Sequence, residues 1–201
     1  MKGKFTLVTL CALLLLGAAL ASVGYSNASR SNGPPLDDIS APGLPVAEAG
    51  LAIAEVATLR STSVDPRSVR RLAVRGGSRF YPATTEAGHR CYLVGVDRGG
   101  ADHFGAVSCA HAETTFPSEE SPVLDLSLQF RDQDMRLTSI ERVAGFAADG
   151  IAAIRFEDAL GAEISSLPVQ NNVYAGGKLT AVPSRMVALD QAGVVVHAVD
   201  L

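Results

Sequence analysis

The sequence predicts a mainly β domain, a small antiparallel β-sandwich or barrel-like fold with one helix near its start. The runs "VLDLSLQF", "IAAIRFED" and "VVVHAVDL" are rich in alternating or β-branched apolar residues, and turn sequences such as "AADG" and "QAG" separate them. The stretch from residue 89 to 111 is nearly palindromic about "RGGAD", which is typical of a symmetric hairpin. With 47% hydrophobic and 19% charged residues, the 201-residue chain is able to bury a core.

The first residues have the layout of an export signal. Lys2 and Lys4 precede an apolar run over residues 5–21 that ends in "ALA", a small-x-small cleavage sequence. A signal peptide over residues 1–21 is therefore predicted. Residues 5–24 are also long enough to stay as an uncleaved membrane anchor, and this alternative is left open. Either way, the rest of the chain is expected to be exported, either extracellular or at the cell surface.

Two further segments follow the export signal. Residues 22–43 are rich in Ser, Asn, Gly and Pro and poor in large apolar residues, so we expect a flexible linker. Residues 44–201 are expected to form the globular domain. Whether this domain divides into two cores near residues 115–122 is left open.

The first elements of the domain are a helix, a helical turn and two strands. In "LPVAEAGLAIAEVATLR", apolar residues recur at helical spacing from Val46, with Pro45 in the first turn. Asp65 and the proline after it are suited to the N-cap and first position of a short helical turn. A strand through residues 72–74 follows, and "RFYPA" predicts another, in which Pro82 marks an edge or an end.

The near-palindrome also predicts the register of its hairpin. A five-residue loop at residues 98–102 pairs Asp97 with His103, and the same register places Cys91 opposite Cys109. Directly opposed residues have Cα atoms about 4.5–5.5 Å apart, which a disulfide bond tolerates. In an exported chain this pair predicts a disulfide that stabilises the fold by roughly 3 kcal/mol. The more apolar side of the hairpin, expected to face the core, carries Tyr92, Val94, Val96, Phe104 and Ala106.

The ends of this hairpin also hold a candidate metal site. The register opposes His89 to His111 next to the two cysteines, and these four residue types are those of a Cys₂His₂ zinc site. A flat ladder is a poor zinc geometry, and export favours the disulfide, so no metal or other cofactor is expected. His89 and His111 remain the candidates for a metal-binding pair if the cysteines are joined.

The rest of the chain offers little recognisable chemistry. The sequence has no nucleophile elbow, zinc-protease helix motif, P-loop or dinucleotide fingerprint. His197 lies in an apolar strand and is expected to pack there. Asp132 and Asp134 have the spacing of a calcium loop but lack the other ligands, so an exposed turn explains them as well. In "PVQNNVYAGG" the asparagines are expected to supply a positive-φ turn and Tyr174 to pack.

The segment from "GFAADG" to "PVQNNVYAG", together with the paired cysteines, resembles a group of exported bacterial proteins. The matching positions are Asp149-Gly150, Pro168-Val169, Asn172 and Tyr174, with Cys91 and Cys109 upstream. Ala148 stands where the group usually has proline. The likeness spans roughly residues 70–198 and rests on turn residues and strand alternation. It implies a fold and a compartment, but no catalytic chemistry.

Composition limits the functions to be considered. The net charge is −4 and no dense Lys/Arg block is present, so a nucleic-acid partner is not expected. We expect an exported, non-enzymatic β module that acts as a structural or interaction domain for a protein, glycan or envelope partner. Two alternatives are a secreted hydrolase whose catalytic residues are scattered along the chain, and a metal-binding protein that uses His89 and His111.

Overall fold

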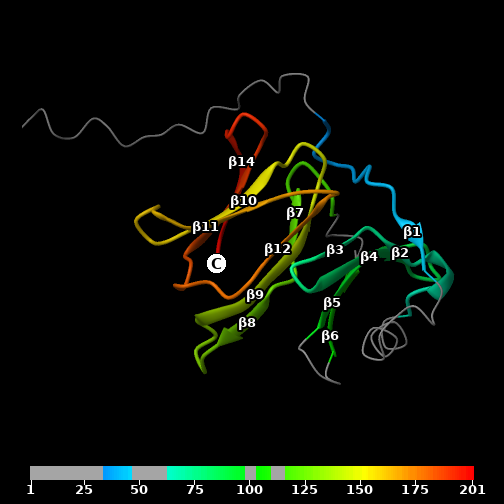
Figure 1. Ribbon diagram of the computed structural model, residues 1–201, viewed down its shortest axis with the longest axis horizontal. Coiled ribbons are helices and arrows are strands. Elements are labelled where there is room, and N and C mark those ends of the chain that lie inside the picture. Colours follow the sequence, from blue (N-terminus) through cyan, green and yellow to red (C-terminus); the bar gives the residue numbers. More distant parts are fainter. Residues whose placement is uncertain (1–33, 47–62, 98–102, 110–115) are drawn as a thin grey trace, which may run out of the picture. The chain divides into compact units, whose positions relative to one another are not determined.

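The computed structural model describes residues 34–46, 63–97, 103–109 and 116–201 (Figure 1). The predicted signal peptide and residues 22–33 of the predicted linker lie outside the described residues. Most of the predicted N-terminal helix lies outside them too. The first residues of that helix prediction are described and are extended, because Leu44–Pro45 forms strand β1.

The described residues contain one short 3₁₀ helix and fourteen strands, and every strand pairing among them is antiparallel. A mainly β fold is therefore confirmed. None of the sheets closes into a barrel. Beyond β1, the elements are η2 (Pro66–Ser68), β2 (Arg70–Arg71), β3 (Ala73–Arg75), β4 (Ser78–Thr84), β5 (Arg90–Asp97), β6 (His103–Cys109), β7 (Val123–Asp125), β8 (Leu128–Arg131), β9 (Leu137–Ala147), β10 (Ala153–Glu157), β11 (Glu163–Pro168), β12 (Val173–Gly176), β13 (Arg185–Leu189) and β14 (Val195–Asp200).

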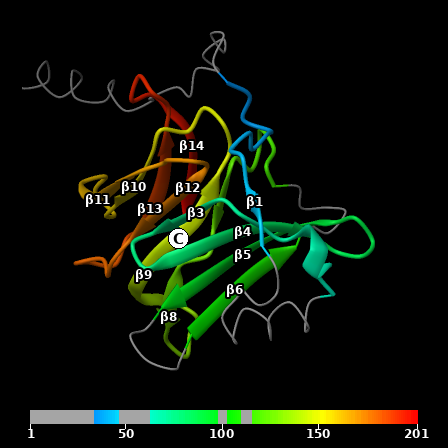
Figure 2. The same ribbon diagram turned by 45° about the vertical axis from the view of Figure 1, so that its right-hand side comes forward.

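Strands β3, β4, β5 and β6 lie side by side and form what we call the hairpin sheet (Figure 2). The predicted register is confirmed, because Asp97 opposes His103 and Cys91 opposes Cys109. Pro82 lies inside β4, beyond the point where β3 stops pairing with that strand. The edge position predicted for the proline is thus confirmed, since its missing N–H faces no strand on that side.

The short helical turn before this sheet also follows its prediction. Asp65 is the N-cap of η2, and its side chain accepts a hydrogen bond from the Arg67 backbone N–H at 2.9 Å. The Ser68 hydroxyl donates to the Thr84 carbonyl at 3.1 Å and accepts from the Thr84 N–H at 2.8 Å. These bonds attach the turn to the open side of β4, where β3 has ended.

Two other sheets pack in series behind the hairpin sheet. The central sheet has the order β12-β9-β7, with β8 continuing the edge of β7 along β9, and the C-terminal sheet has the order β11-β10-β13-β14. Side chains of the hairpin and central sheets form one core, which includes Phe80, Tyr92, Val94, Ala144, Phe146 and Val173. The central and C-terminal sheets form another, which includes Ile140, Val143, Ile154, Phe156, Tyr174 and Met186. Residues on both sides of positions 115–122 therefore share a core.

Part of the outer face of the hairpin sheet is buried as well. The side of Tyr92, predicted to face the core, packs on the central sheet through a Tyr92–Phe146 ring contact at 5.0 Å. The alternate face carries Cys91 at 0% exposure and Leu93 at 4%, against Val64 and Val69 among others. The Cys91 end of the hairpin sheet is therefore buried on both faces, whereas Val74 on β3, on the same outer face, is 63% exposed.

Three hairpins close with the same five-residue turn. In each, an aspartate Oδ1 accepts from the backbone N–H groups two and four residues ahead, at 2.8–2.9 Å. The fourth residue of each turn has a positive φ, where glycine is the least strained residue. The turns begin at Asp132, Asp158 and Asp190, and their fourth residues are Met135 (φ 62°), Gly161 (φ 80°) and Gly193 (φ 77°).

Residues 34–46 form an extended strap across the sheets rather than a free linker. The Ala41 N–H donates to Asn172 Oδ1 at 3.0 Å and the Ser40 N–H to Asp149 Oδ1 at 3.2 Å. Leu36, 8% exposed, joins the core between the central and C-terminal sheets. At its end, the strap pairs with β2 through β1. Residues 34–43, assigned to the linker from composition, are thus held by backbone contacts.

Candidate functional site

An open groove of about 500 Å³ lies where the β8–β9 hairpin extends past the end of β5. Its lining residues are Val96, Leu128, Phe130, Ser139, Glu141 and Arg142. Leu128 opposes Arg142 and Phe130 opposes Ser139 across the hairpin, so these four side chains share one face. The groove thus has an apolar floor with polar groups beside it.

Phe130 is the most accessible apolar group in the groove. Its side chain is 48% exposed, although the alternation in "VLDLSLQF" is typical of a strand whose apolar face is buried. The predicted single strand breaks between β7 and β8, and β8 then follows β9 to the tip of the hairpin, where Phe130 is not buried by the described residues. An exposed aromatic ring on a groove floor is a common contact for a bound ring or side chain.

The charges in the groove are unequally compensated. Glu141 accepts a hydrogen bond from Lys178 Nζ at 2.7 Å, and this contact lowers the pKa of the Glu141 carboxyl. Arg142 instead donates from Nη1 to the backbone carbonyl of Gly76. Among the described residues no carboxylate pairs with Arg142, whereas the charge of Glu141 is balanced by Lys178.

The polar side of the predicted strand turns inward at the break between β7 and β8. The Asp125 carboxylate accepts hydrogen bonds from the Ser127 hydroxyl, from Gln129 Nε2 at 2.8 Å and from the Tyr174 hydroxyl at 3.2 Å. Burial raises the pKa of Asp125, and these hydrogen bonds oppose that rise. Tyr174 is 0% exposed, and a Cβ at Gly145 would stand 2.2 Å from its hydroxyl oxygen. The cluster is enclosed, which indicates a role in positioning β12 against β9.

Cys91 and Cys109 meet as the sequence predicts. Their Sγ atoms lie 2.05 Å apart, a disulfide distance, and their Cα atoms 4.0 Å apart. His89 is exposed at the start of this ladder, whereas His111 lies outside the described residues. The metal-binding pair of His89 and His111 therefore stays a prediction. In the described part of the chain, no group of three or more His, Cys, Asp and Glu side chains is placed to hold a metal ion.

The other residues discussed from the sequence lie in turns, strands or the core, outside the groove. Asp132 caps its turn, as the exposed-turn alternative expected. Asn171 and Asn172 have φ values of 51° and 61°, which confirms the positive-φ turn. Tyr174 packs in the core. His197 lies on β14 opposite Ala188, and partial burial lowers its pKa.

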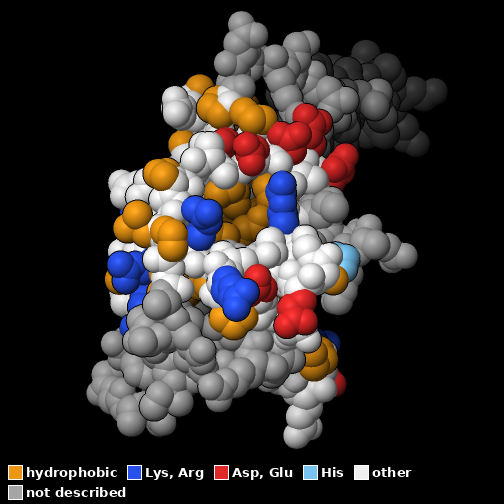
Figure 3. Space-filling model, turned by 90° about the vertical axis from the view of Figure 1, so that its right-hand side faces the viewer, with side chains coloured by type: hydrophobic (Ala, Val, Ile, Leu, Met, Phe, Trp, Pro, Cys, Tyr) orange, Lys and Arg blue, Asp and Glu red, His pale blue; other side chains and the backbone are white. Residues whose placement is uncertain are grey.

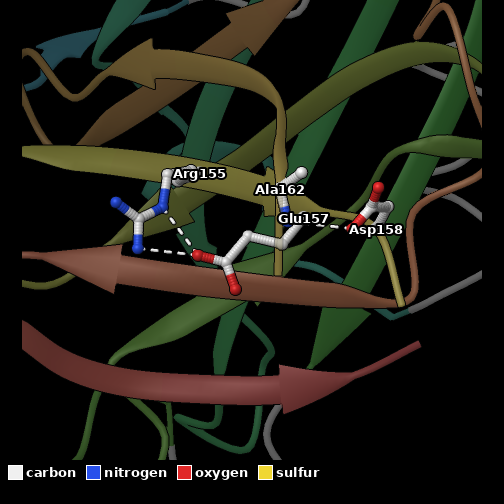
Figure 4. A network of polar contacts seen from close by, with 4 residues as sticks. All are labelled: Arg155, Glu157, Asp158 and Ala162. Atoms are coloured by element: carbon white, nitrogen blue, oxygen red, sulfur yellow. Dashed lines mark hydrogen bonds and ion pairs between the residues drawn. The ribbon is translucent and has the colours of Figure 1, made fainter. Parts of the chain in front are cut away.

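A further polar contact lies on the C-terminal sheet. Arg155 and Glu157 project from the same face of β10, and Arg155 Nε and Nη2 both contact Glu157 Oε1, at 2.8 and 2.6 Å (Figure 4). Figure 4 also shows the Ala162 N–H donating to the Asp158 carboxylate, one of the three repeated turns. Glu157 is 6% exposed, so the ion pair neutralises a buried charge.

The face turned to the viewer in Figure 3 has a hollow and an uneven distribution of charged side chains. A hollow with hydrophobic side chains on its floor lies between Lys or Arg side chains, and acidic side chains gather above it. Hydrophobic and basic groups thus occur together on this face.

Comparison of the chain with protein families, with characterised proteins and with solved structures finds no match in any of the three. Among residues 34–46, 63–97, 103–109 and 116–201, no helix is both long enough and apolar enough to cross a bilayer. The proposed function therefore depends on the groove and on the chemistry of its side chains.

Proposed function

We propose that the protein is an exported, non-enzymatic binding module that takes an acidic glycan of the cell envelope into the groove beside β8 and β9. The observation that carries the proposal is the groove itself, with its exposed Phe130, its polar Ser139 and Arg142, which pairs with no carboxylate of the described residues. Its volume of about 500 Å³ lies in the range of small-ligand sites and suits one or two sugar rings.

Each part of the groove matches a part of an acidic sugar. The C–H face of a sugar ring packs on an exposed aromatic ring as other apolar surfaces do. Ser139 and Glu141 offer a hydroxyl and a carboxylate for sugar hydroxyl groups. Arg142 offers a guanidinium, the side chain that best recognises carboxylate, phosphate and sulfate groups. A neutral or basic ligand would leave that charge uncompensated.

The export layout of residues 1–21 and the cysteine pair support the compartment. Two cysteines at disulfide distance suit an oxidising space, and envelope polysaccharides occur there. The N-terminus of the chain recovered from its exported fraction, read by intact mass spectrometry, tests this part. A mass that begins at Ser22 supports secretion, and a full-length mass recovered only with membranes supports the anchor.

A binding experiment tests the groove. We expect the exported chain to bind polygalacturonate in isothermal titration calorimetry, and to bind neutral dextran more weakly. The Phe130→Ala variant is expected to lose about tenfold or more in affinity. Leu160→Ala is the matched control, because Leu160 is 93% exposed on a different hairpin.

Three results would overturn the proposal. Equal affinities of Phe130→Ala, Leu160→Ala and the wild type would remove the groove from binding. Binding to polyglutamate but not to any polysaccharide would point to a protein partner. Release of shorter sugars from the polymer would show that the module is an enzyme.

A further inference from the structure

The β3–β4 turn brings two polar side chains to the groove end of the hairpin sheet. Gly76 and Gly77 have φ values of 55° and 75°, and this two-residue turn places Arg75 directly opposite Ser78. On its other side Ser78 opposes Val96, which lines the groove. Directly opposed residues share a face, so Arg75, Ser78 and Val96 all project toward the central sheet.

Both side chains have donors that are buried and unpartnered. Ser78 is 0% exposed, and its hydroxyl has no hydrogen-bond partner among the described residues. The Nη1 atom of Arg75 is likewise buried and without an acceptor. Buried polar groups are nearly always hydrogen-bonded, because an unmet donor costs more than the bond returns when it is made. Two such donors on opposed residues point to an acceptor that binds there.

Arg142 adds a second guanidinium at the same turn. Its Nη1 donates to the Gly76 carbonyl, and a Cβ at Gly77 would stand 3.1 Å from that nitrogen. Arg142 also lines the groove, so it joins the turn to the groove. In the described part of the chain neither Arg75 nor Arg142 has a carboxylate partner, and Glu141 is held by Lys178.

We propose that Arg75, Ser78 and Arg142 form the anion subsite of the groove and bind the oxyanion of the acidic sugar. The inference rests on the proposed function and names the group that gives the groove its specificity. Two guanidinium forks and the O–H of one hydroxyl supply several donors here, which matches the acceptor-only oxygens of a carboxylate or sulfate. The bound oxyanion also removes the cost of the two unmet donors.

Substitution of Arg75 tests the subsite, with a short oligogalacturonate and its fully methyl-esterified form as probes. Arg75→Met keeps most of the length of the side chain and removes its charge. We expect the affinity for the acid to fall about ten- to a hundredfold, while the affinity for the ester stays unchanged. Arg136→Met, on an exposed arginine of the β8–β9 hairpin, is the matched control and keeps the preference.

Stability gives a second, independent readout. Because Arg75→Met removes a buried donor without a partner, we expect it to raise the Tm of the ligand-free protein by about 2–4 °C. We expect the acid to raise the Tm of the wild type but not of the variant. Arg142→Met and Ser78→Ala repeat the binding test if Arg75→Met does not fold.

The outcomes separate this proposal from the proposed function. If acid and ester bind the wild type equally well, the groove binds sugars but the anion subsite is wrong. If neither probe binds, the proposed function fails as well. An unchanged acid preference in Arg75→Met also overturns the subsite. Stronger binding of dextran sulfate than of the oligogalacturonate would identify sulfate, not carboxylate, as the oxyanion.

Discussion

The side chain of Asn172 joins the strap over residues 34–46 to the turn before β12, and its substitution gives a quantitative prediction. Its Oδ1 accepts from the Ala41 N–H at 3.0 Å, and its Nδ2 donates to the Ala147 carbonyl at 3.0 Å and to Asp149 Oδ1 at 2.8 Å. The residue is 8% exposed, so water does not readily replace these partners. Asn172→Ala removes all three bonds at once.

The size of the effect follows from two terms. Three hydrogen bonds, one buried and two partly buried, contribute about 3 kcal/mol to the free energy of unfolding at about 1 kcal/mol each. The φ of 61° adds about 1 kcal/mol, because alanine is strained in the left-handed region where asparagine is tolerated. We therefore expect Asn172→Ala to lower the free energy of unfolding by about 4 kcal/mol.

The neighbouring asparagine separates the two terms. Asn171 has a φ of 51° and is exposed, so Asn171→Ala carries only the backbone cost of about 1 kcal/mol. Asn172→Gly carries only the lost hydrogen bonds, about 3 kcal/mol. Equilibrium urea unfolding measures all three variants, with the cysteine pair left oxidised. If Asn172→Ala lowers the free energy of unfolding no more than Asn171→Ala does, this prediction is wrong.

Three other predictions concern a turn, the cysteine pair and a buried acid. Met135→Gly should raise the free energy of unfolding by about 0.5–1 kcal/mol, and Gly161→Ala should lower it by about 1 kcal/mol, because these residues occupy the same positive-φ position. Equal effects of both substitutions would contradict this, in the same urea assay. Reductant should lower the stability of the wild type by about 2–5 kcal/mol and leave a Cys91→Ala, Cys109→Ala double variant unchanged. An identical melting curve with and without reductant would contradict the cross-link. The raised pKa of Asp125 means that the folded state keeps a proton that the unfolded state loses near pH 3.9. The stability due to this group is therefore full below that pH and declines as pH rises through the folded pKa. Asp125→Asn should lack this slope, and parallel stability curves for the two proteins would exclude it.

The sequence predicts best where local patterns decide the structure. The palindrome around residues 98–102 gives the register of the β5–β6 hairpin, because turn residues and alternation act over a short distance. The edge position of Pro82 and the N-cap at Asp65 follow from their own backbone chemistry. The positive φ of Asn172 is predictable for the same reason.

Features that depend on distant contacts were not predictable in this way. The strap is polar and rich in proline, like a linker, but Asn172 and Asp149 bind it across 131 and 109 residues of sequence. The alternation in "VLDLSLQF" indicates a strand there, but no local signal shows that Asp125 contacts the Tyr174 hydroxyl. Composition also did not reveal that the hairpin sheet has a buried apolar cluster on each face.

The candidate site is the clearest example of this limit. Its residues come from β3, β4, β5 and the β8–β9 hairpin, and none forms a recognisable motif along the chain. Arg75 and Arg142 would be read from sequence as ordinary surface charges. Only the antiparallel register and the turn at Gly76 bring them to one place.

The most direct test of the proposed binding site is to map ligand contact by NMR on the full exported chain during titration with oligogalacturonate. We expect the amide signals of Val96, Leu128, Phe130 and Arg142 to shift together, with those of Arg75 and Ser78. We also expect signals of the β10–β11 hairpin around Leu160 to stay in place. Saturable shifts confined to another surface, or no shifts at millimolar oligosaccharide, would contradict the claim that this groove is the binding site.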